Sequence, residues 1–247
     1  MKALLLAAGL GTRLRPLTDS IPKCLVPVHG TPLLGIWLKM LTEAGCGPLL
    51  VNLHYLPDKV QEYLDNSIYS GAVQSVFEEE LLGTAGTLLK NRDFFDKAPH
   101  MLIHADNLSL FDVRAFIQSH LNRPPGCEIT MMTFETDVPQ SCGILELDES
   151  GVVMAFHEKV ANPPGNLANG AVYIVEPSLF DFLKGLNKDV IDFSTEVIPG
   201  YLGRIFTFKN ECYHRDIGNL CSYQAALDET AALNLSGTAW GSDWSNR

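Results

Sequence analysis

Residues 2–32 read KALLLAAGLGTRLRPLTDSIPKCLVPVHGTP, and this stretch decides the fold. Its first part, residues 3–7, is short and apolar and runs directly into Gly9, which is typical of a strand buried on both faces of a parallel sheet. Gly9 and Gly11 allow the chain to turn sharply and approach a ligand closely, so that successive backbone N–H groups can point at an anion. We therefore expect a buried first strand followed by a glycine loop that binds phosphate.

The residues that follow the two glycines suit phosphate oxygens. Thr12 offers a hydroxyl, and Arg13 carries a guanidinium that stays charged and can donate two parallel hydrogen bonds. Lys23 adds a second cation a little further along the chain. A dinucleotide-binding fingerprint is excluded because Leu14 stands where its third glycine would be, and a P-loop is excluded because the chain has no Gly-Lys-Ser/Thr triplet.

The string AGLGTR at residues 8–13, with PLT at 16–18 and PK at 22–23, resembles the signature of the sugar-1-phosphate nucleotidyltransferases. The resemblance continues to about residue 223, with the family's motifs in their usual order. It implies that an oxygen of a sugar 1-phosphate attacks the α-phosphorus of a nucleoside triphosphate, which gives a nucleotide sugar and pyrophosphate. Mg²⁺ is the implied cofactor, and the two substrates are the implied partners.

Composition limits the class of protein. The chain has 247 residues, of which 46% are hydrophobic, as expected of one sizeable globular α/β domain. The formal net charge of −11 argues against nucleic acid as a partner, because a phosphate backbone requires a basic surface. No apolar run reaches the roughly 18 residues of a membrane span, so no membrane association is expected. Homo-oligomer formation is left open.

The six cysteines show neither a paired metal-binding spacing nor the pattern of a small disulfide-rich domain. The apolar start could be taken for a signal peptide, but it leads into GTRLRP rather than into a cleavage region. Reduced thiols and a cytoplasmic location are therefore expected.

Strand and helix patterns alternate along the chain, which predicts an α/β fold with ligands at the carboxyl ends of the strands. Strands are expected at residues 3–7, 49–53, 73–77, 101–105, 128–134 and 152–156, and helices at residues 32–45, 58–64, 84–89 and 223–233. We expect a doubly wound, mostly parallel sheet of the Rossmann-like, glycosyltransferase-A-like type, with a small sugar-binding β insertion. One domain is expected over residues 1–235, followed by a short tail at residues 236–247.

Two aspartates are candidate metal ligands. Asp106 follows the expected strand 101–105, although Ala105 stands where the family usually has glycine or serine. Asp216 lies in the string YHRDIGN at residues 213–219, which resembles the family's last motif. Mg²⁺ favours carboxylate oxygens and usually takes one or two of them from the protein. The resemblance therefore implies that both aspartates hold Mg²⁺, whereas a lone Asp after a strand is also typical of a helix cap.

The string EEELLGTAG at residues 78–86 resembles the motif that lies against the nucleotide base. The resemblance implies that Glu78, Glu79 and Gly83 bind the nucleotide, with Gly83 giving the base room. A carboxylate can accept both neighbouring donors of guanine, whereas uracil and thymine present one donor between two acceptors. GTP is therefore favoured. An ordinary helix start, with acidic residues near its positive end, is the alternative reading.

Three further motifs resemble the family's sugar-binding segments: SCGI at residues 141–144, HEK at 157–159 and LANGAVY at 167–173. The resemblance implies that Lys159 binds the sugar phosphate, while Glu158, Asn169 and the Gly143 backbone read sugar hydroxyls. Adjacent side chains of a continuing strand would put Glu158 and Lys159 on opposite faces. Val160 replaces the family's proline, and the Asn-Gly pair could instead form a hairpin turn.

The resemblance also implies roles for the first motif. Arg13 would bind the triphosphate and the leaving pyrophosphate, and Lys23 the α-phosphate. The remaining nucleotide-binding residues would be Ala8, Gly9, Gly11 and Thr12, and the catalytic set would be Arg13, Lys23, Asp106 and Asp216. No general base is required, because a phosphate monoester is already an anion at neutral pH.

Several functions remain open at this point. The EEELLGTAG string looks more like the guanylyltransferases for mannose 1-phosphate than like the thymidylyltransferases. A UTP- or dTTP-using enzyme and a heptose-1-phosphate guanylyltransferase are alternatives. A non-catalytic nucleotide-sugar-binding regulator is a further class, but such a protein would be expected to have lost Arg13, Lys23 or a metal carboxylate, and all are present.

Overall fold

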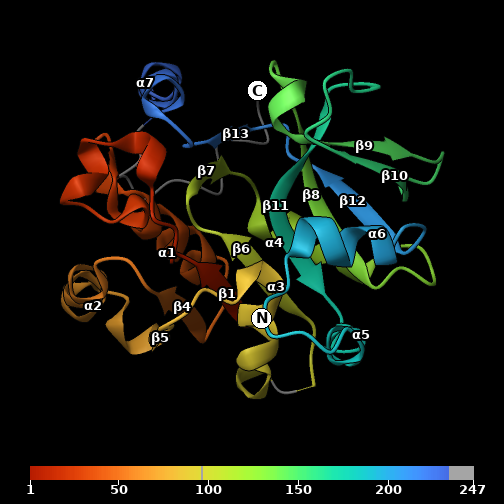
Figure 1. Ribbon diagram of the computed structural model, residues 1–247, viewed down its shortest axis with the longest axis horizontal. Helices are drawn as coiled ribbons and strands as arrows, with labels where there is room; N and C mark the ends of the chain where they lie inside the picture. The colour runs from red at the N-terminus through yellow and green to blue at the C-terminus, as the bar shows by residue number, and fades with distance from the viewer. Residues whose placement is uncertain (96, 234–247) are drawn as a thin grey trace. The chain divides into compact units, whose positions relative to one another are not determined.

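The computed structural model describes residues 1–95 and 97–233, so the expected tail at residues 236–247 lies outside the described residues (Figure 1). The chain divides into two compact units. Among the described residues, the first unit comprises residues 1–80, 104–113 and 212–233, and the second comprises residues 81–95, 97–103 and 114–211. Each unit is therefore assembled from segments that are distant in the sequence.

The first unit contains three parallel strands in the order β1, β4, β5, joined by helices. These elements are β1 (Ala3–Leu6), α1 (Leu33–Glu43), β4 (Leu49–Leu53), α2 (Pro57–Asn66) and β5 (Val73–Phe77). All five side chains of β4 are buried, as expected of a strand covered on both faces. This repeated strand–helix–strand arrangement is the predicted doubly wound pattern, and the predicted α/β class is confirmed (Figure 1).

Helix α1 shows how the sequence places the core of this unit. Pro32 precedes its first residue, and Gly45, with φ of +82°, follows its end in a left-handed conformation that favours glycine. The Trp37 side chain is 1% exposed, and its indole Nε1 donates to the carbonyl of Asn107 at 3.0 Å. The apolar face of α1 therefore covers both the parallel sheet and the start of a distant segment.

Short elements complete the first unit. They are η1 (Thr12–Leu14), η2 (Leu17–Asp19), η3 (Lys23–Leu25), β2 (Pro27–Val28), β3 (Thr31–Pro32), η4 (Ser70–Ala72), β7 (Asn107–Leu110), β13 (Tyr213–Asp216) and α7 (Leu220–Glu229). Strands β7 and β13 pair antiparallel, with Asp216 opposite Asn107. This pair brings two segments more than a hundred residues apart to the same place.

Helix α7 is fastened to the strand that precedes it. Arg215 on β13 donates to both carboxylate oxygens of Glu229, at 2.8 and 2.6 Å, and the Tyr213 hydroxyl donates to the same carboxylate at 2.6 Å. At its other end the helix begins with a capping box, in which Asn219 and Ser222 exchange hydrogen bonds. The C-terminal end of α7 is therefore tied to β13 through Glu229, while the capping box fixes the start of the helix.

The second unit contains a sheet in which strand β11 pairs antiparallel with β6, β8 and β9. Its strands are β6 (His100–His104), β8 (Ile129–Glu135), β9 (Gly143–Leu147), β10 (Val153–Glu158), β11 (Leu167–Val175) and β12 (Ile205–Lys209). Its helices are α3 (Gly83–Lys90), η5 (Arg92–Phe95), α4 (Val113–Leu121), η6 (Pro139–Ser141), α5 (Leu179–Gly185), η7 (Phe193–Val197) and α6 (Ile198–Gly200). The predicted β insertion corresponds to the antiparallel strands β9, β10 and β11.

Within the part of the chain that the structure describes, no helix combines the length and the apolar character that a membrane span requires.

A buried histidine lies in the core of the second unit. His100 is fully buried, and its Nδ1 donates to the Ala98 carbonyl at 3.1 Å. The rings of Phe95 and Phe180 stack on it, with centroids 4.3 and 5.1 Å away. Burial lowers the pKa of His100 from 6.5 to about 4, because the charged form would lose its hydration.

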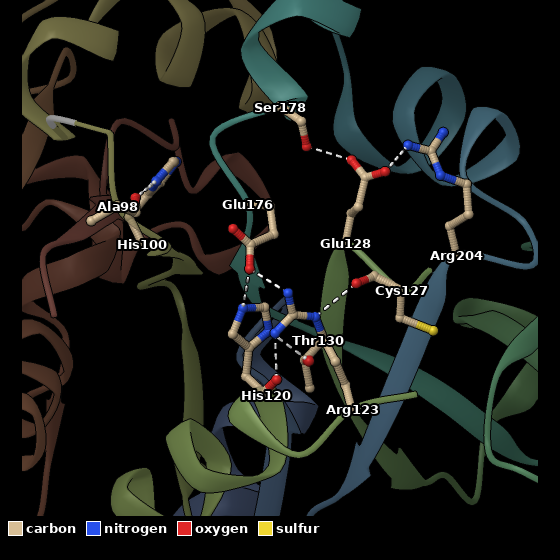
Figure 2. A network of polar contacts seen from close by, with 10 residues as sticks. All are labelled: Ala98, His100, His120, Arg123, Cys127, Glu128, Thr130, Glu176, Ser178 and Arg204. Carbon is tan, nitrogen blue, oxygen red and sulfur yellow. Dashed lines mark hydrogen bonds and ion pairs between the residues drawn. The ribbon is translucent and has the colours of Figure 1, made fainter. Parts of the chain in front are cut away.

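A second buried histidine lies in a polar network that Figure 2 shows. His120 on α4 is fully buried, with Nδ1 at 2.8 Å from the Thr130 hydroxyl and Nε2 at 3.4 Å from Glu176 Oε1. The guanidinium of Arg123 already bonds to that same Glu176 oxygen. Burial, with repulsion from Arg123 as the second cause, lowers the pKa of His120 from 6.5 to about 4.

These two histidines predict a loss of stability in mild acid. The unfolded chain takes up protons on them as the pH falls from 6.5 toward 4, and the folded chain does not. Their contribution is therefore complete above pH 6.5 and is lost toward pH 4. Urea unfolding should give a free energy lower by on the order of 1–2 kcal/mol per histidine at about pH 5 than at about pH 7.

The variant His120→Gln should flatten this pH dependence, since an amide does not titrate. The matched control is His157→Gln on β10, whose ring contacts Glu146 near the surface. Equal pH slopes for the parent and His120→Gln would contradict the assignment.

Candidate functional site

In the first unit the glycine loop and Asp106 meet where β1 ends. The backbone N–H of Ala105 donates to the carbonyl of Leu6 at 3.1 Å, which sets Asp106 beside the end of the strand. A Cβ placed on Gly9 would lie 3.9 Å from Asp106 Oδ2. The predicted phosphate loop and the predicted metal ligand therefore share one location.

Lys23 lies between the two predicted metal carboxylates. Its residue is 6% exposed, and its Nζ lies 2.7 Å from Asp106 Oδ2 and 3.7 Å from Asp216 Oδ1. Burial alone would raise the pKa of the Asp106 carboxyl, but the Lys23 ammonium, helped by His104, outweighs it and holds that pKa below its usual value. A buried cation thus neutralises this pair of carboxylates.

The glycine loop is held by a threonine that the sequence reading did not single out. Gly11 has a φ of +63°, and a Cβ placed on it would lie 3.0 Å from Thr18 Cγ2. The Thr18 hydroxyl donates to the Gly11 carbonyl at 2.7 Å, and the Thr18 carbonyl accepts from the Tyr55 hydroxyl at 3.0 Å. In the sequence, this role of Thr18 is indicated only by its place in the PLT string at residues 16–18.

Arg13 and Asp216 come together over a third glycine. Arg13 and Thr12 are both exposed, so their side chains are available to a ligand, whereas Ala8 is buried. A Cβ placed on Gly218 would lie 3.3 Å from Arg13 Nη2 and 2.5 Å from Asp216 Oδ2. The structure thus brings Arg13, Lys23, Asp106 and Asp216 together within the first unit.

The three glutamates at residues 78–80 differ sharply in exposure. Strand β5 ends at Phe77, so these three residues follow the strand and their side chains need not alternate between its two faces. Glu78 is fully buried, whereas Glu79 and Glu80 are exposed. The carboxylates of Glu79 and Glu80 are therefore the ones available to a nucleotide base.

In the second unit, Gly83 packs against backbone. Its φ is +74°, and a Cβ placed on it would lie 2.5 Å from the carbonyl oxygen of Ile191. That oxygen also accepts from the N–H groups of Ala85 and Gly86, at 2.9 and 3.1 Å. The missing side chain of Gly83 therefore lets the start of α3 dock on residue 191, and its predicted role beside a base stays a prediction.

Gly143, Glu158 and Lys159 also lie together in this unit. Gly143 pairs with Glu158 across strands β9 and β10, and a Cβ placed on Gly143 would lie 2.7 Å from Glu158 Oε2. Lys159 has a φ of +49°, so β10 ends at Glu158 and the chain turns. The expectation of opposite faces was therefore wrong, because Lys159 Nζ comes within 3.1 Å of Glu158 Oε1.

Asn169 lies in strand β11 and not in a hairpin turn. Ala171 has a φ of +54°, and the pairing with β8 shifts register between Asn169 and Tyr173. The amide of Asn169 is oriented by its own strand, since Oδ1 accepts from the Ala171 N–H at 2.9 Å and Nδ2 donates to the Tyr173 hydroxyl at 2.7 Å. Each end of the amide retains capacity for one further hydrogen bond.

The donor set in the first unit suits a divalent cation. Two carboxylates already share the ammonium of Lys23, so this is a place where positive charge is favoured. Among residues 1–95 and 97–233, no group of three or more His, Cys, Asp or Glu is arranged to hold a metal ion. Hard oxygen ligands in this number fit Mg²⁺, which usually takes only one or two carboxylates from a protein.

Comparison with known protein families assigns the chain to one of them. Residues 2–232 match the family described as nucleotidyl transferase. The chain belongs to this family. The mannose-1-phosphate guanyltransferase of Pichia angusta is 28% identical over 252 residues, which cover 97% of this chain and 68% of that protein. The resemblance to sugar-1-phosphate nucleotidyltransferases is thereby confirmed.

Two further similar proteins are associated with different nucleotides, one through its name and one through the molecule bound to it. The UTP–glucose-1-phosphate uridylyltransferase of a Synechocystis strain is 28% identical, over 74% of this chain and 51% of its own length. The structure of HddC from Yersinia pseudotuberculosis complexed with GMP-PN aligns with a TM-score of 0.77 and 25% identity, over 92% of this chain and 98% of that chain. The chain spans between 49% and 68% of the length of the curated relatives it matches.

The docking of Gly83 on residue 191 predicts a specific loss of stability. Gly83→Ala should lower the free energy of unfolding by about 1–3 kcal/mol more than Gly126→Ala, because the added methyl group meets backbone that cannot move aside. Gly126 is the matched control, since its φ is +90° and no atom lies within 4 Å of the added carbon. Chemical unfolding followed by circular dichroism measures the difference. Equal losses of unfolding free energy in the two variants would show that the backbone at Ile191 moves aside for the added methyl group.

Proposed function

We propose that the chain transfers a nucleotidyl group from a nucleoside triphosphate to a sugar 1-phosphate, with release of pyrophosphate. The observation that carries the proposal is the buried Lys23 ammonium between Asp106 and Asp216, beside an exposed Arg13 and a glycine loop. Two polyanionic substrates require this combination of cations and metal-binding carboxylates.

Asp106 and Asp216 would hold Mg²⁺, which supplies positive charge to the phosphates when bound. Lys23, whose Nζ lies 2.7 Å from Asp106 Oδ2 and 3.7 Å from Asp216 Oδ1, would bring a fixed positive charge to the α-phosphate beside these carboxylates.

Arg13 would bind the triphosphate and then the leaving pyrophosphate. Its guanidinium is exposed beside Gly218, and the planar fork can donate two parallel hydrogen bonds to phosphate oxygens. No group has to remove a proton from the attacking oxygen, since the sugar phosphate is already an anion. The residues of this unit would therefore act through position and charge.

The second unit would read the sugar 1-phosphate. Lys159 is exposed in a left-handed turn and would pair with the phosphate, while its neighbour Glu158 would accept from sugar hydroxyls. Asn169 has one donor and one acceptor position left for the sugar, in an orientation that Ala171 and Tyr173 determine. The backbone of Gly143 would complete this set.

GTP is the proposed nucleotide, and mannose 1-phosphate the proposed sugar. The exposed carboxylates of Glu79 and Glu80 suit the paired donors of guanine, and guanylyltransferases occur among the relatives. A second candidate is a UTP enzyme, favoured by the uridylyltransferase relative from Synechocystis. A dTTP enzyme, a heptose-1-phosphate guanylyltransferase and a non-catalytic regulator are further alternatives.

The activity is tested by pyrophosphate release from each common nucleoside triphosphate against a panel of sugar 1-phosphates. Turnover with at least one pair is expected, and Asp216→Asn should reduce it by several orders of magnitude while the fold persists, because an amide is a poor ligand for Mg²⁺. The matched control is Asp228→Asn on α7, an exposed aspartate bonded to Gln224. No turnover with any pair would favour the regulator.

Base selection is tested by two single variants, Glu79→Gln and Glu80→Gln. One of them should lower the ratio of kcat/KM for GTP to that for UTP about tenfold, because the new amide donor faces a ring donor of guanine. Glu62→Gln on α2 is the control, since Glu62 is exposed and belongs to the same unit. An unchanged ratio in both variants, or a parent enzyme that prefers UTP, would remove the argument for guanine.

A further inference from the structure

One polar side chain interrupts the apolar strand β4. The strand reads LLVNL, and its asparagine, Asn52, is 2% exposed. Both ends of its amide are used: Oδ1 accepts from the backbone N–H of Ala7 at 2.7 Å, and Nδ2 donates to Glu78 Oε2 at 3.2 Å. Asn52 therefore joins residues that follow the two neighbouring strands of the sheet.

The pairing of the strands explains why Asn52 is at this level. Leu6, the last residue of β1, pairs with Asn52, which in turn pairs with Val76 of β5. A strand that continued past Leu6 would send the next N–H to backbone of β4. A side-chain oxygen accepts from Ala7 instead, so β1 can leave the sheet here and enter the glycine loop.

Glu78 is fixed behind Asn52 by its backbone. Its N–H donates to the Leu53 carbonyl at 2.9 Å, and its own carbonyl lies 2.8 Å from His54 Nδ1. Its side chain is fully buried, and its Oε1 has no hydrogen-bond partner among the described residues. Burying a carboxylate with one oxygen unpaired lowers the stability of the fold. The position of Glu78 beside the Asn52 amide therefore needs an explanation other than stability.

We propose that Asn52 and Glu78 are positioning residues for the glycine loop. The relay from Glu78 through Asn52 to Ala7 sets where the chain turns away from β1, and so aims the N–H groups of the loop at the triphosphate. The carboxylate of Glu78 accepts only, which dictates that Nδ2 of Asn52 faces it and that Oδ1 faces Ala7. The relay therefore also selects one orientation of the amide.

This role rests on the proposed function only for the identity of the ligand. It differs from direct reading of the base by Glu78, because both oxygens of that carboxylate are enclosed and one is engaged by Asn52. Glu79 and Glu80, which are exposed, remain available for the base. Glu78 would thus support the loop, and Glu79 or Glu80 would contact the nucleotide.

The test exchanges the amide between the two positions. In Asn52→Asp, Ala7 keeps an acceptor but a second carboxylate faces Glu78, so the loop should shift. In the double variant Asn52→Asp with Glu78→Gln, the aspartate accepts from both Ala7 and the new amide, and the pair keeps the formal charge of the parent. Glu78→Gln alone leaves an acceptor for Asn52 but no longer fixes the orientation of its amide, so exchange at residues 7–12 should rise, though less than in Asn52→Asp.

Two measurements are made on each variant. Hydrogen exchange at residues 7–12 should be faster in Asn52→Asp and return to the parent rate in the double variant. Calorimetry with a non-hydrolysable triphosphate should show binding weakened about tenfold or more in Asn52→Asp and restored in the double variant, as expected for a buried hydrogen bond. Asn66→Asp, an exposed substitution at the end of α2, is the matched control.

The outcomes separate the two proposals. A parent that binds no triphosphate would defeat the proposed function, while exchange at residues 7–12 would still decide the relay. A double variant that exchanges as fast as Asn52→Asp would overturn the relay. So would an Asn52→Asp protein that is less stable overall but keeps the parent exchange and affinity, because Asn52 would then support the core and not the loop. Loss of GTP binding in Glu78→Gln alone would assign Glu78 to the base instead.

Discussion

The first unit depends on the burial of one positive charge. An ammonium taken out of water is strongly unfavourable unless anions accompany it, and Lys23 is 6% exposed. Its partners, Asp106 and Asp216, come from two segments that lie far along the chain. The antiparallel pair β7 and β13 sets those segments side by side, and the hydrogen bond from Ala105 to Leu6 ties them to the parallel sheet. Lys23 can therefore be buried only when these segments are in place, and their two aspartates are held close together only because Lys23 lies between them.

The parts of the fold that could be predicted are those with local signals. The bounds of β4 and β5 agree with expectation because each is a short run bounded by turn residues, and α1 is recognisable from Pro32 and Gly45. Strand β11 was not predicted, since its Asn-Gly pair is typical of a turn and only its neighbours in the sheet keep it extended. Strands β7 and β13 were also missed, because their pairing joins residues 107–110 to residues 213–216 and leaves no local pattern.

In the candidate site, too, the residues with local sequence signals could be predicted and those that depend on tertiary contacts could not. The four charged residues of the first unit could be named from motifs, because charge and spacing are visible in the sequence. Their supports could not, since Thr18 and Asn52 act through particular backbone groups that only the folded chain brings near. The asparagine inside LLVNL did indicate that a hydrogen-bond partner lies nearby, because a buried amide in a strand is rarely left unpaired. Its partners, Ala7 and Glu78, could not be read from it.

The clamp between β13 and α7 has a consequence for the order in which the protein is made. Arg215 and Tyr213 both bind Glu229, and Asp216 is the next residue along the strand. On a ribosome, which releases the chain from its N-terminus, residues 1–110 emerge long before the strand that completes β7. Lys23 and Asp106 can meet early, but Asp216 is secured only when Glu229 has left the exit tunnel. A growing chain therefore holds Asp106 before it holds Asp216, and the carboxylate pair is complete only after Glu229 has emerged.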